Sequence, residues 1–385
     1  MLRIAHIIAT FPPHVGGMGT VAYEECRRLA SLGHEMTVFT LSYPGQHYDD
    51  SGVPFRIVRL KPMLRVGDAG WVPGLLGKLQ GFDVVHLHYP WYGGAEWVWL
   101  AGLFHKQKYV VTYHMDAVPE GWFKKLIQAV YDIFLAKAIL GGAAKVFAVS
   151  KENFAINRFG KYLSGEKMVE LVNGVDTEIF RPQTVDPAEV GLGDWKDKKI
   201  ILFVGNLLPV KGLDIVLQVF KQWQDEKSPL EGGLRGMLDQ RLLIVGGGYE
   251  ESRYRKMTTY YGLQTTVRFV GSCTDKKELA RYYNVACCAV VPSLVESFSL
   301  VAVEALACGI VVVGSNILGI RERIESDGFL FTAGSVESLK EVLEKVLSLS
   351  TEERKVMGER GRKKVVEKYS LEKHMQKLEA AYRTL

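Results

Sequence analysis

The chain has 385 residues, of which 48% are hydrophobic and 24% charged, the composition of an ordinary globular protein. Its formal net charge of +5 is small for this length and is spread over both halves, which excludes a strongly basic nucleic-acid binder. The length favours two domains, and the absence of any run of about 18 apolar residues argues against a membrane-spanning helix.

The cysteines and the start of the chain favour a cytoplasmic protein. The five cysteines are an odd number and form no C-x-x-C pair, which predicts a reducing compartment without a disulfide framework. The first apolar segment is short and is followed by a Pro-Pro-His-Val-Gly-Gly loop, so a first β-strand is expected rather than a signal peptide.

Short apolar segments alternate with helical patterns along the chain. In the first half the predicted strands are RIAHIIA, EMTVFTL, DVVHLHY, YVVTYH and KVFAVS, and VAYEECRRLASLG is a predicted helix. In the second half KIILFVG and RLLIVGGG precede helices from about Leu213 and Glu250, and VRFVG, ACCAVVPS and IVVVGS are further strands. This alternation predicts an α/β fold with two doubly wound parallel sheets.

The predicted boundary between the two domains lies in segment 180–195, which is rich in Pro, Gly and Asp. We place an N-terminal domain at 1–182 and a C-terminal domain at 183–370. The pattern of the last helix, about 371–385, suits a helix that packs back on the first domain. Because ligands of open α/β sheets bind at the carboxyl ends of the strands, two facing domains predict a site in the cleft between them.

The loop after the first strand is rich in glycine, at Gly16, Gly17 and Gly19, where the backbone can approach a ligand closely. Gly17, Gly19 and Ala22 also satisfy the G-x-G-x-x-A pattern of dinucleotide-binding turns. However, the second strand ends without an acidic residue to hold a ribose. A plain tight turn is another alternative, and we favour a loop that faces the interdomain cleft.

Histidines occur on two strands of the first domain. His86 and His88 point to the same face, because side chains two residues apart on a strand do so. A zinc pair is one interpretation, but no third ligand follows at metal spacing, so satisfied core or cleft histidines are expected. His114, at the end of the next strand, is placed to contact a substrate hydroxyl or a sugar, and a capping role is the alternative.

Two loops of the second domain carry a candidate cation and a glycine run. Lys211 precedes Gly212 and a helix, where a lysine can reach a diphosphate as a mobile point charge. A solvated surface lysine is the alternative. Gly246 begins the run Gly246-Gly247-Gly248, which either frees the backbone beside the cleft or forms a simple turn.

Two glutamates, Glu296 and Glu304, form the most informative pattern of the chain. Glu296 follows an apolar strand, and Glu304 lies in the second turn of the next helix. The helix N-terminus between them offers free backbone N–H groups to an anion. Such a set can hold the hydroxyls and the phosphates of a sugar nucleotide, and a solvated Glu304 is the alternative.

Together these residues resemble glycosyltransferase family four, whose members are retaining GT-B glycosyltransferases, over nearly the whole chain. The matching motifs are the glycine-rich loop, His114, N-G-V-D-x-x-x-F at 173–180, the two glutamates, and the lysine loop G-R-L-x-x-x-K-G at 205–212, in which Asn206 replaces the arginine. The resemblance implies two Rossmann-like domains that face a deep cleft, with the donor bound by the C-terminal domain.

The resemblance also assigns roles to single residues. Glu304 would hold the ribose hydroxyls, Glu296 the donor sugar and Lys211 the diphosphate. His114 would contact the sugar near the reacting carbon, so the expected catalytic residues are His114, Lys211 and Glu296. The expected donor-binding residues lie on strand-end loops of both domains and are Gly16, Gly17, Asn206, Lys211, Gly246, Phe298, Ser299, Leu300 and Glu304.

By this resemblance the protein moves a sugar from a nucleotide-diphosphate sugar to a hydroxyl acceptor and retains the anomeric configuration. A departing phosphate oxygen takes the acceptor's proton, which leaves no protein carboxylate as base. No D-x-D motif occurs, so neither a metal nor another cofactor is expected. Asn206 keeps a second function open, a catalytically impaired partner subunit that binds sugar nucleotide; an epimerase or phosphorylase on the same fold is a third.

The acceptor is a glycan, a lipid-linked molecule or a small molecule. Five of the seven tryptophans lie in the first domain, and segment 121–139 combines aromatic with basic residues. Docking of this segment on the inner face of a membrane is one interpretation, and ordinary core packing of the tryptophans is the other. No nucleic-acid partner is expected.

Overall fold

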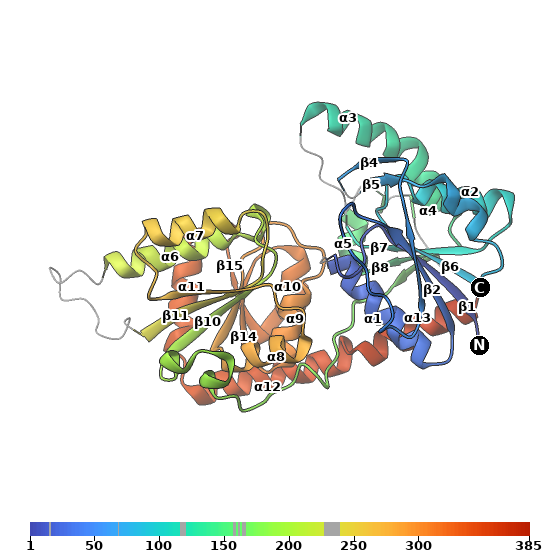
Figure 1. Cartoon of the computed structure of the whole chain (residues 1–385). Coiled ribbons are helices and arrows are strands. Elements are labelled where there is room, and N and C mark those ends of the chain that lie inside the picture. Colours follow the sequence, from blue (N-terminus) through green and yellow to red (C-terminus); the bar gives the residue numbers. More distant parts are fainter. Residues whose placement is uncertain are drawn as a thin grey trace. The chain divides into compact units, whose positions relative to one another are not determined.

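A computed structural model describes residues 1–14, 17–67, 69–115, 121–156, 159–160, 162–163, 167–226 and 239–385. The chain divides into two compact units (Figure 1). Unit 1 comprises Met1–Gly174 together with Glu372–Leu385, and unit 2 comprises Val175–Leu371. Within the described residues, no helix combines the length and the apolar character needed to cross a membrane.

Unit 1 is built on a parallel sheet in the order β3-β2-β1-β6-β7-β8-β9. Its strands are β1 Arg3–Ile7, β2 Glu35–Leu41, β3 Arg56–Leu60, β6 Val84–Tyr89, β7 Tyr109–Tyr113, β8 Lys145–Ala148 and β9 Met168–Glu170. Strands β1, β6 and β7 are almost entirely buried, as expected for parallel strands that are covered on both faces. A short antiparallel hairpin, β4 Leu64–Val66 and β5 Ala69–Trp71, lies outside this sheet.

The helices of unit 1 come from both ends of the sequence. They are α1 Gly17–Ser31, α2 Ala95–Phe104, α3 Trp122–Tyr131, α4 Lys137–Gly142, α5 Lys151–Ile156 and α13 Leu371–Arg383, with the π-helical segment η2 Asp132–Ala136 between α3 and α4. Helix α13 packs in unit 1 through polar contacts: Arg28 binds Glu372 at 2.9 Å, and His34 lies 3.3 Å from Glu379. One strand-like bridge, Val175 to Ser370, holds the start of α13 beside the segment that leaves unit 1.

Unit 2 is a second parallel sheet, in the order β12-β11-β10-β13-β14-β15. Its strands are β10 Lys199–Val204, β11 Gln240–Val245, β12 Val267–Gly271, β13 Cys288–Val291, β14 Val311–Ser315 and β15 Gly328–Phe331. Its helices are α6 Leu213–Asp225, α7 Glu251–Tyr260, α8 Lys276–Val285, α9 Leu300–Ala307, α10 Leu318–Ile324, α11 Val336–Ser348 and α12 Thr351–Lys368. Helices α6, α7 and α11 cover one face, and α8, α9, α10 and α12 cover the other (Figure 1). The prediction of two doubly wound parallel sheets is confirmed.

Each sheet has a point at which the strand order reverses. In unit 1 this point lies between β1 and β6, and in unit 2 it lies between β10 and β13. The loops that leave two such strands run to opposite faces of the sheet, which opens a crevice at their carboxyl ends. The loop after β10 carries Lys211 and the loop after β13 carries Glu296, so the topology brings the two predicted residues of unit 2 to one place.

Candidate active site

Lys211 and Glu296 form an ion pair at the reversal point of unit 2. Lys211 ends the short 3₁₀ turn η6 (Pro209–Lys211), and its Nζ donates to Glu296 Oε2 at 2.6 Å. The neighbouring backbone holds the two loops together, since Leu294 N–H donates to the Val210 carbonyl at 2.8 Å. Both charged side chains remain about a quarter exposed, at 27% and 21%, so a ligand can reach them.

Two glycines fix the backbone beneath this ion pair. Gly212 has φ of +69°, and a Cβ there would lie 2.2 Å from the Pro292 carbonyl oxygen. A Cβ on Gly319 would lie 2.2 Å from the carbonyl oxygen of Glu296. Any side chain at either position would therefore displace the loops that carry Lys211 and Glu296.

Ser299 begins α9 in an unusual backbone conformation. Its φ is +61°, in the left-handed region, and its Oγ accepts a hydrogen bond from Ala302 N–H at 3.3 Å. A residue with a Cβ pays ~1–2 kcal/mol for this conformation. The N-cap bond offsets that cost, because a serine cap contributes about 0.5–2 kcal/mol. The helix N-terminus thus starts next to Glu296, where its first N–H groups have no partner within the helix.

Phe298 contributes its backbone to this region while its side chain belongs to the core. The ring is 3% exposed and lies against Tyr369, with ring centroids 6.0 Å apart. The side chain of Arg323 is also buried, and its guanidinium lies 4.6 Å from the Phe298 ring centroid. This packing anchors the turn between Glu296 and α9, which the sequence pattern did not predict.

Glu304 lies one turn into α9 and is held by Tyr283 of α8. The Tyr283 hydroxyl donates to Glu304 Oε2 at 2.9 Å. Burial raises the pKa of Glu304 to about 7, and the hydrogen bond from Tyr283 opposes this rise. The residue is half-buried, so it keeps partial contact with solvent. Burial and the adjacent Glu304 carboxyl raise the pKa of Tyr283 well above its usual value. Glu304 is therefore positioned by a neutral donor, and its charge state changes near neutral pH.

Only glycine fits at position 246, because the loop after β11 packs there against the loop after β10. Gly246 has φ of +149°, and a Cβ would lie 1.9 Å from the carbonyl oxygen of Gly205, in the loop that carries Asn206. A Cβ on Gly248 would come within 2.8 Å of Leu207. The glycine run therefore lets two strand-end loops touch, and Asn206 lies exposed beside them.

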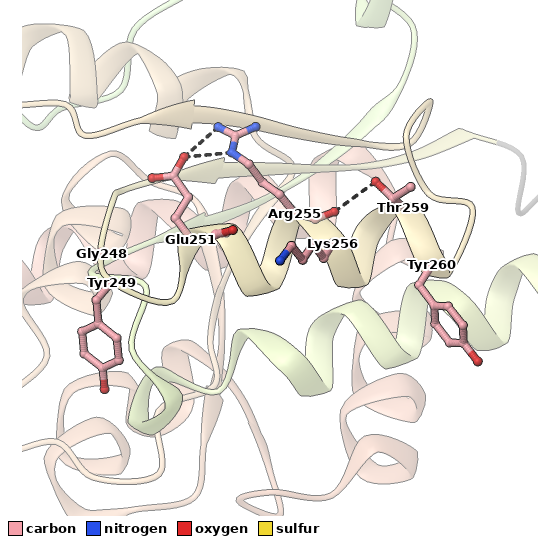
Figure 2. A pocket seen from close by; sticks show the side chains of 8 residues that line it. Gly248, Tyr249, Glu251, Arg255, Lys256, Thr259 and Tyr260 are labelled. Carbon is pink, nitrogen blue, oxygen red and sulfur yellow. Dashed lines mark hydrogen bonds and ion pairs between the residues drawn. The ribbon is translucent and has the colours of Figure 1, made fainter.

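A hollow of about 870 Å³ borders this glycine run and extends along α7 (Figure 2). Figure 2 shows Glu251 bound to Arg255 on one side of the helix, with Tyr249 and Tyr260 at its two ends. The lining residues are Gly248, Tyr249, Glu251, Ser252, Arg255, Lys256, Thr259 and Tyr260. None of the predicted site residues lines this hollow, and its Glu251–Arg255 pair is already satisfied.

The predicted site residues of unit 1 are Gly16, Gly17 and His114, and they differ in burial and surroundings. Gly16 lies outside the described residues. Gly17 is the exposed first residue of α1, whereas a Cβ on Gly19 would lie 2.9 Å from the Thr10 carbonyl oxygen, so Gly19 serves packing. His114 follows β7 and is only 8% exposed, and its Nε2 lies 2.9 Å from Nδ1 of His88. Burial lowers the pKa of His114 to about 4, so the ring is neutral.

His114 belongs to a buried polar cluster that sequence spacing did not predict. The expectation that His86 and His88 share one face is confirmed, with ring centroids 4.4 Å apart. Burial lowers the pKa of His6 to about 4 and that of His88 well below its usual value. The remaining members come from distant segments, and they are His6, Glu25, His374 and Tyr382.

The sequence matches known families along most of its length. The family described as Glycosyltransferase Family 4 matches residues 15–179, and the family described as Glycosyl transferases group 1 matches residues 191–364. D-inositol 3-phosphate glycosyltransferase 1 of Catenulispora acidiphila is 30% identical over 350 residues, which cover 81% of this chain and 77% of that protein. N-acetyl-alpha-D-glucosaminyl L-malate synthase of Bacillus anthracis is 25% identical, with 96% of this chain and 94% of that protein covered.

Solved structures share the fold over the whole chain. Sucrose-phosphate synthase from Thermosynechococcus elongatus matches with a TM-score of 0.80 at 22% identity, and covers 100% of this chain and 99% of its own. Anabaena Alr3699/HepE in complex with UDP-glucose matches with a TM-score of 0.77 at 15% identity, with both chains covered completely. The paired sheets are those of the GT-B fold, and the chain belongs to glycosyltransferase family 4 and is a glycosyltransferase of the hexosyltransferase type.

Proposed function

We propose that this enzyme transfers a sugar from a nucleotide-diphosphate sugar to a hydroxyl acceptor, with retention of configuration and without metal in the transfer step. The observation that carries the proposal is the Lys211–Glu296 pair, 2.6 Å apart, beside the turn that starts α9. A lysine ammonium and a helix N-terminus both favour a diphosphate, and a carboxylate beside them can accept hydrogen bonds from sugar hydroxyls.

The chemistry needs cationic groups because negative charge builds on the departing diphosphate. The N-terminus of α9 contributes only ~0.3–2 kcal/mol toward this charge. Asn206 carries no charge where the related family has arginine, and losing such a partner costs ~1.5–3 kcal/mol. Lys211 therefore supplies positive charge to this site, and Glu296 holds its ammonium in place before the donor arrives.

Glu304 would hold the ribose. A carboxylate accepts two hydroxyl hydrogen bonds, and the Tyr283 hydroxyl occupies only part of its acceptor capacity. From unit 1, Gly17 is proposed to approach the donor and His114 to contact the sugar. A nucleotide-sugar donor is supported by related folds, since Anabaena Alr3699/HepE was solved with UDP, with UDP and glucose, and with UDP-glucose.

The decisive experiment measures donor binding and turnover in the same preparations. We expect a panel of nucleotide sugars to yield one donor whose nucleotide diphosphate is released with an acceptor present. The product should keep the anomeric configuration of the donor, and added chelator should leave the rate unchanged. Glu304→Ala should abolish detectable donor binding, whereas Glu341→Ala, an exposed change on α11, should leave it intact. Unchanged donor affinity in Glu304→Ala would refute the site.

Asn206 favours one alternative, a catalytically impaired subunit that binds sugar nucleotide. That protein would bind the donor through Glu304 and Lys211 and release no nucleotide diphosphate with any acceptor. An epimerase or a phosphorylase on this fold would instead convert the donor without an acceptor hydroxyl. Acceptors should start with D-inositol 3-phosphate and L-malate, which appear in the names of the related enzymes.

We also propose that α3 and the following segment η2 dock on an anionic membrane surface. Large apolar side chains there are more than half exposed, namely Trp122, Leu126, Ile127, Val130, Ile133 and Phe134. The side chains of Phe123 and Lys124 lie outside the described residues. Of the tryptophans predicted either for the core or for this surface, Trp91 is buried and Trp122 is 77% exposed. An apolar helix face of this kind suits the interface of a bilayer. An enzyme docked there could use a lipid-linked acceptor.

Co-sedimentation with anionic vesicles at low salt tests this surface. Val130→Asp should weaken vesicle binding by at least about tenfold, because the apolar contact of a valine is worth ~1.5 kcal/mol and the added charge is repelled. Val356→Asp on α12 is the matched control, since Val130 and Val356 are both 52% exposed. A wild-type protein that stays in the supernatant, or equal loss in both variants, would contradict the proposal.

A further inference from the structure

The core of unit 1 contains a cluster of ligand-type side chains that the transfer reaction does not use. His6 of β1, Glu25 of α1, and His86 and His88 of β6 each have 0% exposure. Their nearest nitrogen and carboxylate oxygen atoms all lie within 4.8 Å of one another. Polar groups at this depth are costly unless each one is paired, so the cluster calls for an explanation.

Three of these atoms form a triangle with the dimensions of a metal site. His88 Nε2 lies 2.9 Å from His6 Nδ1, and Glu25 Oε2 lies 3.7 Å from each of these nitrogens. The point equidistant from the corners of such a triangle is about 2.0 Å from each atom. Bonds from zinc to histidine nitrogen and to carboxylate oxygen are ~2.0–2.2 Å long.

Glu25 Oε2 gives a second, independent indication. This oxygen is buried and has no hydrogen-bond partner among the described residues. It faces two imidazole nitrogens from 3.7 Å, which is too far for a hydrogen bond. A cation at the centre of the triangle would satisfy the carboxylate oxygen and both nitrogen lone pairs at once.

The other polar atom of each of these three residues is already held by a neighbour. His6 Nε2 lies 3.1 Å from the Tyr382 hydroxyl, and His88 Nδ1 lies 2.9 Å from His114 Nε2. Glu25 Oε1 lies 2.8 Å from His374 Nε2. Protein metal sites commonly orient their ligands through such outer partners.

We propose that His6, Glu25 and His88 bind a divalent transition-metal ion of the zinc class in the core of unit 1. His86 is the candidate fourth ligand, although its Nδ1 and Nε2 now contact Tyr382 at 2.5 Å and Thr112 at 2.6 Å. The ligands lie on β1, α1 and β6, so the ion crosslinks the sheet to its first helix. Metal spacing along the sequence does not indicate this site, because Glu25 is 63 positions from His88.

The first test uses the full-length wild-type chain, purified without metal-affinity resin. We expect elemental analysis to find about one zinc per chain after dialysis against chelator, because the site is buried. Refolding in cobalt should give a visible absorption band typical of nitrogen and oxygen ligands in a four-coordinate site. Metal-free folded protein from both routes would overturn the proposal, whatever the outcome for sugar transfer.

Variants then locate the ion. Glu25→Gln keeps the shape of the side chain and removes its charge, and should lower cobalt affinity by at least about tenfold. His105→Gln is the control, because His105 is exposed, is none of the proposed ligands, and has its ring Nδ1 3.1 Å from Gln80 Nε2. A cobalt band that survives Glu25→Gln unchanged would overturn the assignment. If Glu25→Gln fails to fold, the wild-type stoichiometry and cobalt spectrum still decide the outcome.

Discussion

Glu304, the proposed ribose ligand, changes its charge state near neutral pH. Its carboxyl is neutral in much of the population below pH 7, since burial raises its pKa to about 7. In the proposed site the ionised form offers both oxygens to the ribose hydroxyls, whereas the neutral form has a proton on one of them. The same shift acts on stability: the folded form binds a proton that the unfolded form has lost, so Glu304 lowers stability as pH rises from about 4.5 through about 7.

We therefore expect donor affinity to rise by up to about tenfold between pH 6 and pH 8, the ratio of ionised carboxyl at these values for a pKa of about 7. Calorimetry with an intact nucleotide sugar measures this, because its diphosphate lacks the terminal group that titrates near pH 6. Glu304→Gln should bind weakly and independently of pH. A wild-type affinity that stays constant over this range would contradict the expectation.

Single residues also show where sequence patterns stop being informative. The pattern identified Glu296 and Lys211 as separate candidates, yet their contact depends on β10 and β13 being neighbours in the sheet. The backbone of Ser299 could not be predicted either, because serine rarely adopts φ of +61° without a specific packing environment. Local patterns thus indicated the residue types, and strand order and packing determined their geometry.

At the scale of elements, α9 is positioned by an unusually close contact with α12. A Cβ on Gly358 would lie 1.8 Å from the Gly309 carbonyl oxygen, and one on Gly361 would lie 2.7 Å from Leu306. Both glycines lie on α12 three residues apart, so they share one face of that helix. Because α9 carries Glu304, this contact also sets the position of the carboxylate that is proposed to hold the ribose.

Gly358→Ala should destabilise the protein by about 1–3 kcal/mol, the usual cost of overpacking a tight contact. It should also weaken donor binding, since α9 must shift. Gly141→Ala is the matched helical control: nothing lies within 4 Å of its added Cβ, and alanine there should stabilise by about 0.4–1 kcal/mol. Urea unfolding of both variants measures the difference. A Gly358→Ala protein as stable as the wild type would show that α9 and α12 can separate freely.

At the scale of the whole molecule, the sequence predicted the architecture well. Alternating apolar and helical segments identified five strands of each sheet, because parallel strands buried on both faces have long apolar runs. The less buried strands β3, β9 and β15 were not predicted. The buried cluster around Glu25 was not predictable in this way. Its members come from β1, α1, β6, the loop after β7, and α13, and only the folded topology brings them together.

Helix α13 has a consequence for how the protein is made. Its Tyr382 and His374 complete the polar core of unit 1, yet the ribosome synthesises them after the whole of unit 2. At ~5–20 residues per second, the segment 175–371 occupies about 10–40 s of translation. During that interval His86 and Glu25 lack their α13 partners, so the polar core of unit 1 can be completed only after the whole of unit 2 has been made.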